Sequence, residues 1–168
     1  MSQDLEPQCC FKPGRFCCRI LLCPELTVLW SFQVTTTDNP FLDDNFAKYV
    51  GIELIDSGNG TASAQLEILA CHLNGAGLVH GGAVFTLAAW TMAVAANTRY
   101  PLSVGVNAAI TWLRPAAAGT LIARAVEIAA SGRVSTWQVK VTDQDGQTVA
   151  VLQGSACRKD SPGSGDNH

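Results

Sequence analysis

The stretch NGAGLVHGGAVFTLAAWTMAVAAN, residues 74–97, decides the fold of this 168-residue chain. It carries no charged side chain when His80 is neutral, and a long, mostly apolar run follows the triplet His80-Gly81-Gly82. Ala, Leu, Met and Phe favour a helix, and a helix that is apolar nearly all round is buried rather than amphipathic. The stretch therefore predicts a buried helix over about residues 82–97, with a histidine and two glycines at its start.

The sequence after this helix changes to the period of strands. Trp137 and Val139 alternate with the polar residues Gln138 and Lys140, which is typical of a half-buried strand. Asp-Gly at 145–146 is a strong hairpin signal. We expect four strands, at 102–113, 120–131, 134–143 and 148–158.

The sequence before the long helix predicts a short helix and then strands. Asn39 before Pro40 suits a helix start, because asparagine caps and proline is tolerated at the first helical position. The segment 39–56 thus reads as a short amphipathic helix leading into a strand, and 61–69 as a second, half-buried strand. The whole order predicts an α+β fold with one antiparallel sheet wrapped around one helix. Its open edges favour association between copies.

The composition excludes several classes of protein. The formal net charge of −3 argues against a nucleic-acid binder, because such proteins cluster Lys and Arg. A content of 48% hydrophobic and 15% charged residues predicts a packed core. The apolar segment 16–34 is interrupted by Arg19, Pro24 and Glu25, so it fits neither a membrane span nor a signal peptide. We expect no membrane and no nucleic-acid partner.

The cysteines are concentrated at the N-terminal end. Five of the seven fall within residues 9–23, largely as adjacent Cys-Cys pairs, which suit a zinc site poorly. The odd count argues against a disulfide framework and favours a reduced, cytoplasmic protein. We expect neither a metal nor a cofactor. We expect a loosely packed or disordered extension over 1–38, one domain over 39–159, and a flexible tail over 160–168.

The motif HLNGAGLVHGGAVFTLA, with SVGVNAAITWLRP after the helix, resembles a known family. It is similar to the hotdog-fold acyl-CoA thioesterases of the phenylacetate-degradation (PaaI-like) group, within the 4-hydroxybenzoyl-CoA thioesterase superfamily. The resemblance runs from about Asn39 to Arg158. It rests on the asparagine six residues before the histidine, the HGG triplet at the helix start, and the four strands that follow. It implies the hotdog fold and an acyl-CoA substrate.

The resemblance also implies a site at the helix start. In such enzymes a backbone N–H at the N-terminus of the central helix polarises the thioester carbonyl, and Gly81 matches that position, with Gly82 beside it. The physical case is independent, because the first amides of a helix are unpaired and lie at the positive end of its dipole. His80 and Asn74 match residues that shape this corner, and Ser103 matches a hydroxyl that holds the attacking water. Each also has a structural reading: a core histidine, a turn former and a strand-start serine.

Three further residues are candidates for substrate binding. Arg114 and Arg133 are candidates for the CoA phosphates, because guanidinium groups suit phosphate, although most surface arginines bind nothing specific. Trp90 is a candidate for the acyl pocket, although a core or interface role fits it as well. In the family the site is shared between two subunits of a homodimer or homotetramer. One subunit supplies the HGG side, and the other supplies the helix acid and the serine.

The usual helix acid is absent from this chain. The family has a carboxylate nine positions after the HGG histidine, where this sequence has Ala89. A positioned general base contributes about 10²- to 10⁴-fold to rate, so we expect weak or no turnover. The leading prediction is an acyl-CoA thioesterase for aryl or medium-chain acyl groups, and the alternative is a non-catalytic acyl-CoA-binding protein. A hotdog dehydratase is a third possibility, for which His72 is the only candidate second histidine.

Overall fold

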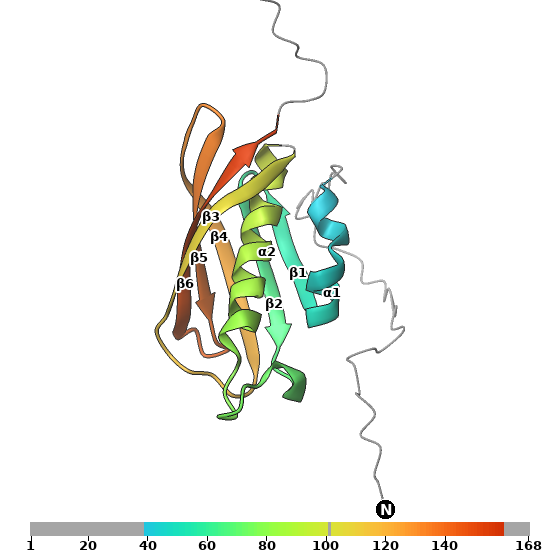
Figure 1. The fold of residues 1–168 in the computed structure, drawn as a ribbon, viewed down its shortest axis with the longest axis vertical. Helices are drawn as coiled ribbons and strands as arrows, with labels where there is room; N and C mark the ends of the chain where they lie inside the picture. The colour runs from blue at the N-terminus through green and yellow to red at the C-terminus, as the bar shows by residue number, and fades with distance from the viewer. Residues whose placement is uncertain (1–38, 101, 160–168) are drawn as a thin grey trace, which may run out of the picture.

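The computed structural model describes residues 39–100 and 102–159. The predictions made for residues 1–38 and 160–168 lie outside this part of the chain. The described part begins with two short helical segments, continues with two strands and a long helix, and ends with four strands (Figure 1). In chain order the elements are η1 (Pro40–Asp43), α1 (Asn45–Val50), β1 (Ile52–Gly58), β2 (Thr61–Glu67), η2 (Ala70–His72), α2 (Gly81–Arg99), β3 (Ser103–Trp112), β4 (Thr120–Ser131), β5 (Val134–Thr142) and β6 (Thr148–Arg158).

The strands form one antiparallel sheet in the order β1-β2-β4-β5-β6-β3. The sheet curves around α2, and α1 lies on the side of α2 near β1 (Figure 1). The predicted α+β hotdog architecture is confirmed. β1 pairs with β2, and β2 pairs with β4 rather than with β3. β3 follows α2 directly in the chain, but it pairs only with β6 and forms the edge opposite β1.

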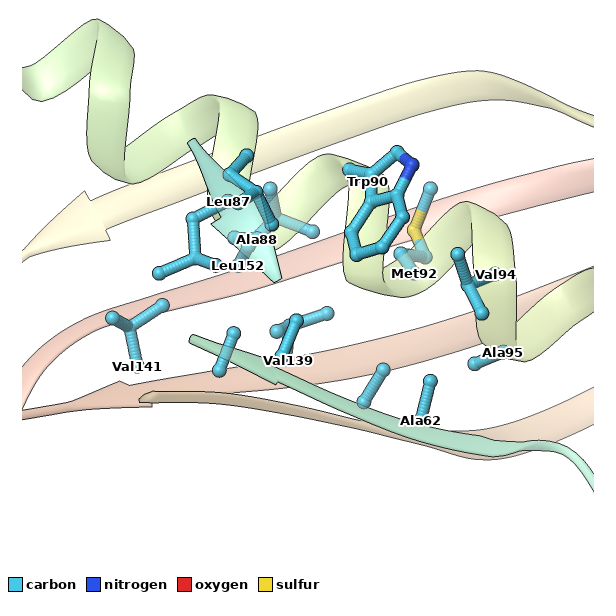
Figure 2. Close-up of a cluster of buried hydrophobic side chains, with 14 of the residues drawn as sticks. Ala62, Leu87, Ala88, Trp90, Met92, Val94, Ala95, Val139, Val141 and Leu152 are labelled. Carbon is cyan, nitrogen blue, oxygen red and sulfur yellow. The ribbon is translucent and has the colours of Figure 1, made fainter. Parts of the chain in front are cut away.

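The core lies between α2 and the inner face of the sheet. Leu87, Val94 and Ala95 of α2 are fully buried, and they face Val139 and Leu152 of the sheet (Figure 2). The alternation predicted for 134–143 is confirmed, because Ser135, Trp137, Val139 and Val141 are all buried. The apolar run of the sequence thus supplies one face of this core.

One face of α2 is not covered by the sheet. Gly82 and Phe85 are exposed and Ala89 is half-buried, and these positions follow one another at helical spacing. The expectation of a helix buried nearly all round is therefore wrong for this stripe. The physical reason is that a single sheet covers only one side of a helix, so the stripe facing away from it stays open within one chain.

The segment before β1 forms two short helices rather than one. Asn39 caps η1 through its side-chain oxygen, and Asp44 caps α1 by accepting from Phe46 N and Ala47 N at 2.8 Å. The segment is held on α2 by the Asn39 amide, which donates to Val94 O at 3.2 Å. In the described part of the chain, no helix is long and apolar enough to span a bilayer.

Candidate functional site

The N-terminal end of α2 leaves one backbone amide open. His80 is the N-cap, and its Nδ1 accepts a hydrogen bond from Gly82 N at 2.9 Å. The amides of Ala83 and Val84 donate to His80 O at 2.9 and 3.3 Å. Within residues 39–100 and 102–159, the Gly81 N–H has no hydrogen-bond acceptor. Gly81 therefore presents an unpaired N–H at the positive end of the helix dipole.

Asn74 shapes the loop that leads into this corner. Its side-chain oxygen accepts from Ala76 N at 2.9 Å and from Leu78 N at 3.2 Å, while its backbone N–H donates to Leu78 O at 2.7 Å. This is the Asx-turn chemistry that asparagine favours. The His80 N–H donates to His72 O at 2.7 Å, so the base of the loop fixes where α2 begins.

His72 is buried and both of its ring nitrogens are engaged. Nδ1 accepts from Leu69 N at 3.1 Å, and Nε2 lies 2.9 Å from Val50 O, a pair that requires Nε2 to carry the proton. This histidine therefore has no nitrogen left for proton transfer to a ligand. The contacts give no support to the dehydratase hypothesis that His72 alone could have carried.

A cavity of about 270 Å³ opens at the N-terminal end of α2. It is lined by Asn74, Gly81 and Arg114, three of the residues named as candidates in the sequence analysis. The other lining residues come from the loop before α2, from α2 itself, from the end of β3 with the loop after it, and from β6: Leu78, Val79, Val84, Trp112, Leu113, Pro115, Ala116 and Val149. The cavity therefore combines an open amide, an exposed guanidinium and an apolar wall, which is the usual make-up of a small-molecule site.

Ala89 lies between two further hollows on the open face of α2. One, of about 300 Å³, separates α2 from η1 and α1, and Trp90 lines it. The other, of about 390 Å³, separates α2 from β3. The Trp90 indole N–H donates to Phe41 O at 2.8 Å, which fixes its ring in the wall of the hollow between α2 and the segment η1–α1. The single carboxylate among the residues that line these hollows is that of the α1 cap, Asp44.

Ser103 and Arg133 are not brought to this site within one chain. Ser103 is 1% exposed, and its hydroxyl donates to Tyr100 O at 2.8 Å, at the opposite end of α2 from Gly81. The hydroxyl donates to the backbone and keeps its lone pairs, so its predicted role in holding water across two subunits stays a prediction. The Arg133 guanidinium donates to the carbonyl of Arg158, the last residue of β6, at 3.0 and 3.2 Å. It joins two ends of strands instead of facing the cavity.

Trp112 is a site residue that the sequence analysis did not identify. A Cβ built on Gly81 would lie 3.2–3.3 Å from the indole atoms Cε2, Cζ2 and Nε1. Trp112 pairs with Ala150 at the end of β3, and Ala150 is buried on the inner face of the sheet. Paired residues lie on the same face of a sheet, so Trp112 points to the inner face. The alternation of inward and outward residues along 103–112 is the sequence signal that could have predicted this position. A side chain at position 81 would therefore press on the ring, which would have to move by a few tenths of an ångström.

No group of three His, Cys, Asp or Glu side chains that could hold a metal occurs within residues 39–100 and 102–159.

Comparisons with known proteins agree with this geometry. Residues 76–150 match the family model of the Thioesterase superfamily. The acyl-coenzyme A thioesterase PaaI of Escherichia coli is 30% identical over 117 residues, which are 69% of this chain and 84% of that protein. The solved structure of E. coli PaaI, from the phenylacetic acid degradation operon, has a TM-score of 0.70 and covers 74% of this chain and 91% of its own.

A second solved structure extends the likeness to another organism. It is a mutant form of the phenylacetic acid degradation protein PaaI from Thermus thermophilus, with 34% identity and a TM-score of 0.66. It covers 69% of this chain and 100% of its own. The HGG-type helix start, the curved antiparallel sheet and these relatives lead to one conclusion: the chain belongs to the thioesterase superfamily, in its PaaI-like group of hotdog-fold acyl-CoA thioesterases.

Proposed function

We propose that this chain binds an aryl- or medium-chain acyl-CoA with the thioester carbonyl oxygen at the Gly81 amide, and that it hydrolyses the ester slowly. The observation that carries the proposal is the unpaired Gly81 N–H, which opens into the cavity that also holds Asn74 and Arg114. An amide fixed at a helix N-terminus is already oriented for an oxyanion, so it costs no reorganisation during the reaction.

The reaction is the addition of water to the thioester. Water attacks the carbonyl carbon and gives up one proton to the surrounding solvent, and the carbonyl electron pair moves to the oxygen, which the Gly81 N–H stabilises. Collapse of this adduct expels CoA as its thiolate, and the acyl group leaves as the free acid. His80 and Asn74 position the amide, since His80 occupies the neighbouring Gly82 N–H and Asn74 shapes the loop. Arg114 provides a guanidinium for a CoA phosphate.

Two copies of the chain complete the site in this proposal. Gly81 and Ala89 are eight residues apart on α2, which corresponds to about 12 Å along the helix axis. That separation is too large for one carbonyl group to meet both positions in one chain. Within the part of the chain that the structure describes, no strand pairs with the outer side of β3, and Val106 on it is 59% exposed. Pairing of two β3 edges in a homodimer, alone or within a homotetramer, would cover this edge.

The alanine at position 89 limits the expected rate. No carboxylate lines the hollow toward β3, and Asp44, in the other hollow, already accepts from two backbone amides. The oxyanion donor and the cavity remain, and such groups alone support slow catalysis. A non-catalytic acyl-CoA-binding protein is the second candidate, and the absence of a carboxylate beside Ala89 is the observation that favours it.

Single-turnover mixing with benzoyl-CoA and octanoyl-CoA tests both candidates. Ala89→Asp should raise hydrolysis at least about 100-fold, because it restores a positioned base. Ala93→Asp is the matched control, since it places a carboxylate one turn further along the same half-buried face. Both variants should lose similar stability, about 1 kcal/mol, because aspartate is a poorer helix former than alanine.

The outcomes separate the proposals. Equal rates for the two aspartate variants would show that the acid position assigned here is wrong. Recovery of intact ester from the parent, with tight binding, would favour the binding protein. Failure of the parent to bind either ester would refute the acyl-CoA site itself. A cytoplasmic location remains part of the proposal, on the grounds of the reduced-cysteine composition given above.

A further inference from the structure

Trp112 packs against Gly81, the residue whose amide receives the carbonyl oxygen in the proposed function. Its indole nitrogen is 3.3 Å from the position that a Cβ would take on Gly81. Both residues line the same cavity of about 270 Å³. The ring is thus packed on the glycine and open to the cavity at the same time, so a ligand atom placed at the Gly81 N–H also lies near the indole.

The N–H of Trp112 is used differently from those of the other described tryptophans. Trp90 donates to Phe41 O at 2.8 Å, and Trp137 donates to Ser135 Oγ at 2.8 Å. Among residues 39–100 and 102–159, nothing accepts from Trp112 Nε1, and the residue is 54% exposed. Its N–H is therefore solvated in the free chain and available to an acceptor that enters the cavity.

Among the first backbone amides of α2, in the part of the chain that the structure describes, only that of Gly81 is open to a carbonyl oxygen. Gly82, whose amide follows that of Gly81, gives its N–H to His80 Nδ1 at 2.9 Å. The next two amides, of Ala83 and Val84, are bonded to His80 O. A carbonyl oxygen has two lone pairs, and an adduct with a full negative charge accepts more than one hydrogen bond. A second donor beside Gly81 has to come from outside the helix.

We infer that Trp112 Nε1–H is that second donor and that Trp112 is a catalytic residue of the hydrolysis. The inference rests on the proposed function, which supplies the thioester at Gly81. As water adds to the carbonyl carbon, the developing negative oxygen accepts from Gly81 N–H and from the indole N–H. No proton leaves Trp112, and both bonds persist until the carbonyl re-forms and CoA thiolate departs.

The test replaces the indole N–H without changing the shape of the ring. Site-specific incorporation of β-(3-benzothienyl)alanine at position 112 exchanges N–H for sulfur. Trp112→Phe, as a second variant, removes the donor with part of the ring. Thr111→Ala is the control, because Thr111 is exposed on the same strand. It pairs with Val151 and therefore lies on the opposite face of the sheet from Trp112.

The first readout is the carbonyl stretching frequency of bound benzoyl-CoA, which needs no turnover. Each hydrogen bond to the oxygen lowers this frequency relative to that of free benzoyl-CoA. The parent and Thr111→Ala should therefore show the larger decrease, and the benzothienyl protein should show a smaller one. The second readout is kcat in the Ala89→Asp background. There, loss of the N–H should lower kcat by about tenfold or more while KM changes little, because the bond strengthens as charge develops.

Each result bears on one of the two proposals. No decrease in frequency in the parent would overturn the Gly81 polarisation, and with it the proposed function. A decrease in the parent that is equally large in the benzothienyl protein would overturn the role of Trp112 alone. Unchanged kcat in the benzothienyl protein would do the same. Should Trp112→Phe fail to fold, the benzothienyl protein still decides, because it preserves the packing against Gly81.

Discussion

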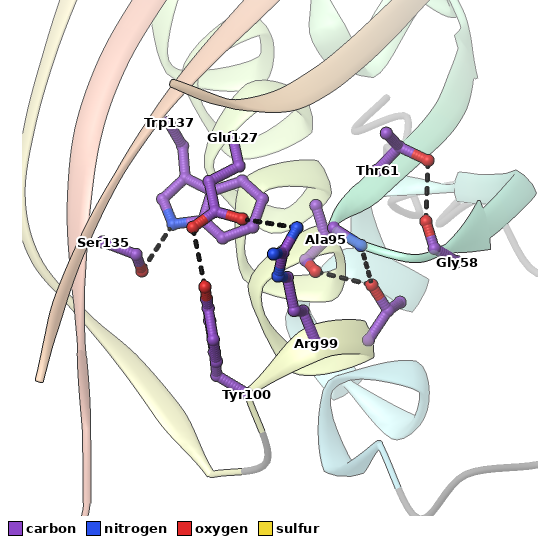
Figure 3. A network of polar contacts seen from close by, with 10 residues as sticks. Gly58, Thr61, Ala95, Arg99, Tyr100, Glu127, Ser135 and Trp137 are labelled. Carbon is purple, nitrogen blue, oxygen red and sulfur yellow. Dashed lines mark hydrogen bonds and ion pairs between the residues drawn. The ribbon is translucent and has the colours of Figure 1, made fainter. Parts of the chain in front are cut away.

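The two ends of α2 use their polar groups in opposite ways. At the C-terminal end, the Tyr100 hydroxyl donates to Glu127 at 2.9 Å, and Arg99 forms an ion pair with the same carboxylate at 3.2 Å (Figure 3). Asn97 clamps the start of β3 there, since its amide donates to Ser103 O at 2.8 Å and its oxygen accepts from Ser103 N at 2.9 Å. Nearly every polar group at this end has a partner inside the chain.

The N-terminal end keeps donors without partners. The Gly81 amide and the Trp112 indole N–H have no acceptor in the described part of the chain, and both face the same cavity. A helix can leave its first amides to a ligand, because water satisfies them when no ligand is present. The comparison therefore separates an end that is completed by the fold from an end that is left for a substrate. Substitutions at the two ends should accordingly affect different measurements.

Asn97→Ala gives the largest expected loss of stability. It removes both partners of Ser103, whose backbone is almost fully buried, so an N–H and a carbonyl are left unsatisfied. Such groups cost about 1–3 kcal/mol each, and we expect the free energy of unfolding to fall by about 2–4 kcal/mol in urea titrations. Binding of benzoyl-CoA by the folded fraction should not change, since this end does not line the cavity.

Asn45→Ala is the matched control for that change. Asn45 is exposed at the first position of α1, and its substitution should alter the free energy of unfolding by less than about 0.5 kcal/mol. A loss in Asn97→Ala no larger than in this control would mean that the C-terminal clamp does not hold α2 to β3. A loss of ligand affinity in the folded protein would remove the distinction between the two ends.

The fold was predictable from the sequence because its signals are periodic and local. The apolar run after Gly82 predicted α2, and the alternation around Trp137 predicted a half-buried strand. The strand order was not predictable, because the pairing of β2 with β4 joins segments separated by the whole of α2. The open stripe along α2 was missed for a related reason, since periodicity does not tell how many sides of a helix a single sheet covers.

The site was predictable only for residues whose positions are determined by the HGG motif and the loop before it. The resemblance located Asn74 and Gly81, and the structure brings both to one cavity with Arg114. It also matched Ser103 to a hydroxyl that holds water, and the bond from that hydroxyl to Tyr100 O is a contact that nothing in the local sequence encodes. Trp112 was overlooked because its contact with Gly81 depends on the register of the final sheet.

A smaller effect is expected at the N-terminal end, from His80→Ala. The substitution removes the acceptor of the Gly82 N–H and should cost about 1 kcal/mol of unfolding free energy, which is typical of a lost N-cap. His80→Ser, whose hydroxyl caps equally well, should recover most of this loss. Urea titrations of the three proteins check the order. If His80→Ser is no more stable than His80→Ala, the imidazole stabilises this end by some contact other than the cap.

The smallest effect is expected at an exposed ion pair far from both ends, which sets the lower limit of the comparison. The hydrogen bond and charge of Lys48 hold the pKa of Asp43 below its ordinary value of 3.8. A carboxyl with a lowered pKa contributes stability above its unfolded-state pKa and loses it as the pH falls through the folded-state pKa.

Both side chains are largely exposed, so solvent screens the pair, unlike Glu127 at the C-terminal end, which is 12% exposed. Asp43→Asn should therefore lower the unfolding midpoint only slightly at neutral pH, and the difference should vanish below the ordinary carboxyl pKa and in high salt. A difference that grows as the pH falls would show that Asp43 stabilises α1 in its protonated form, contrary to the direction of its pKa shift.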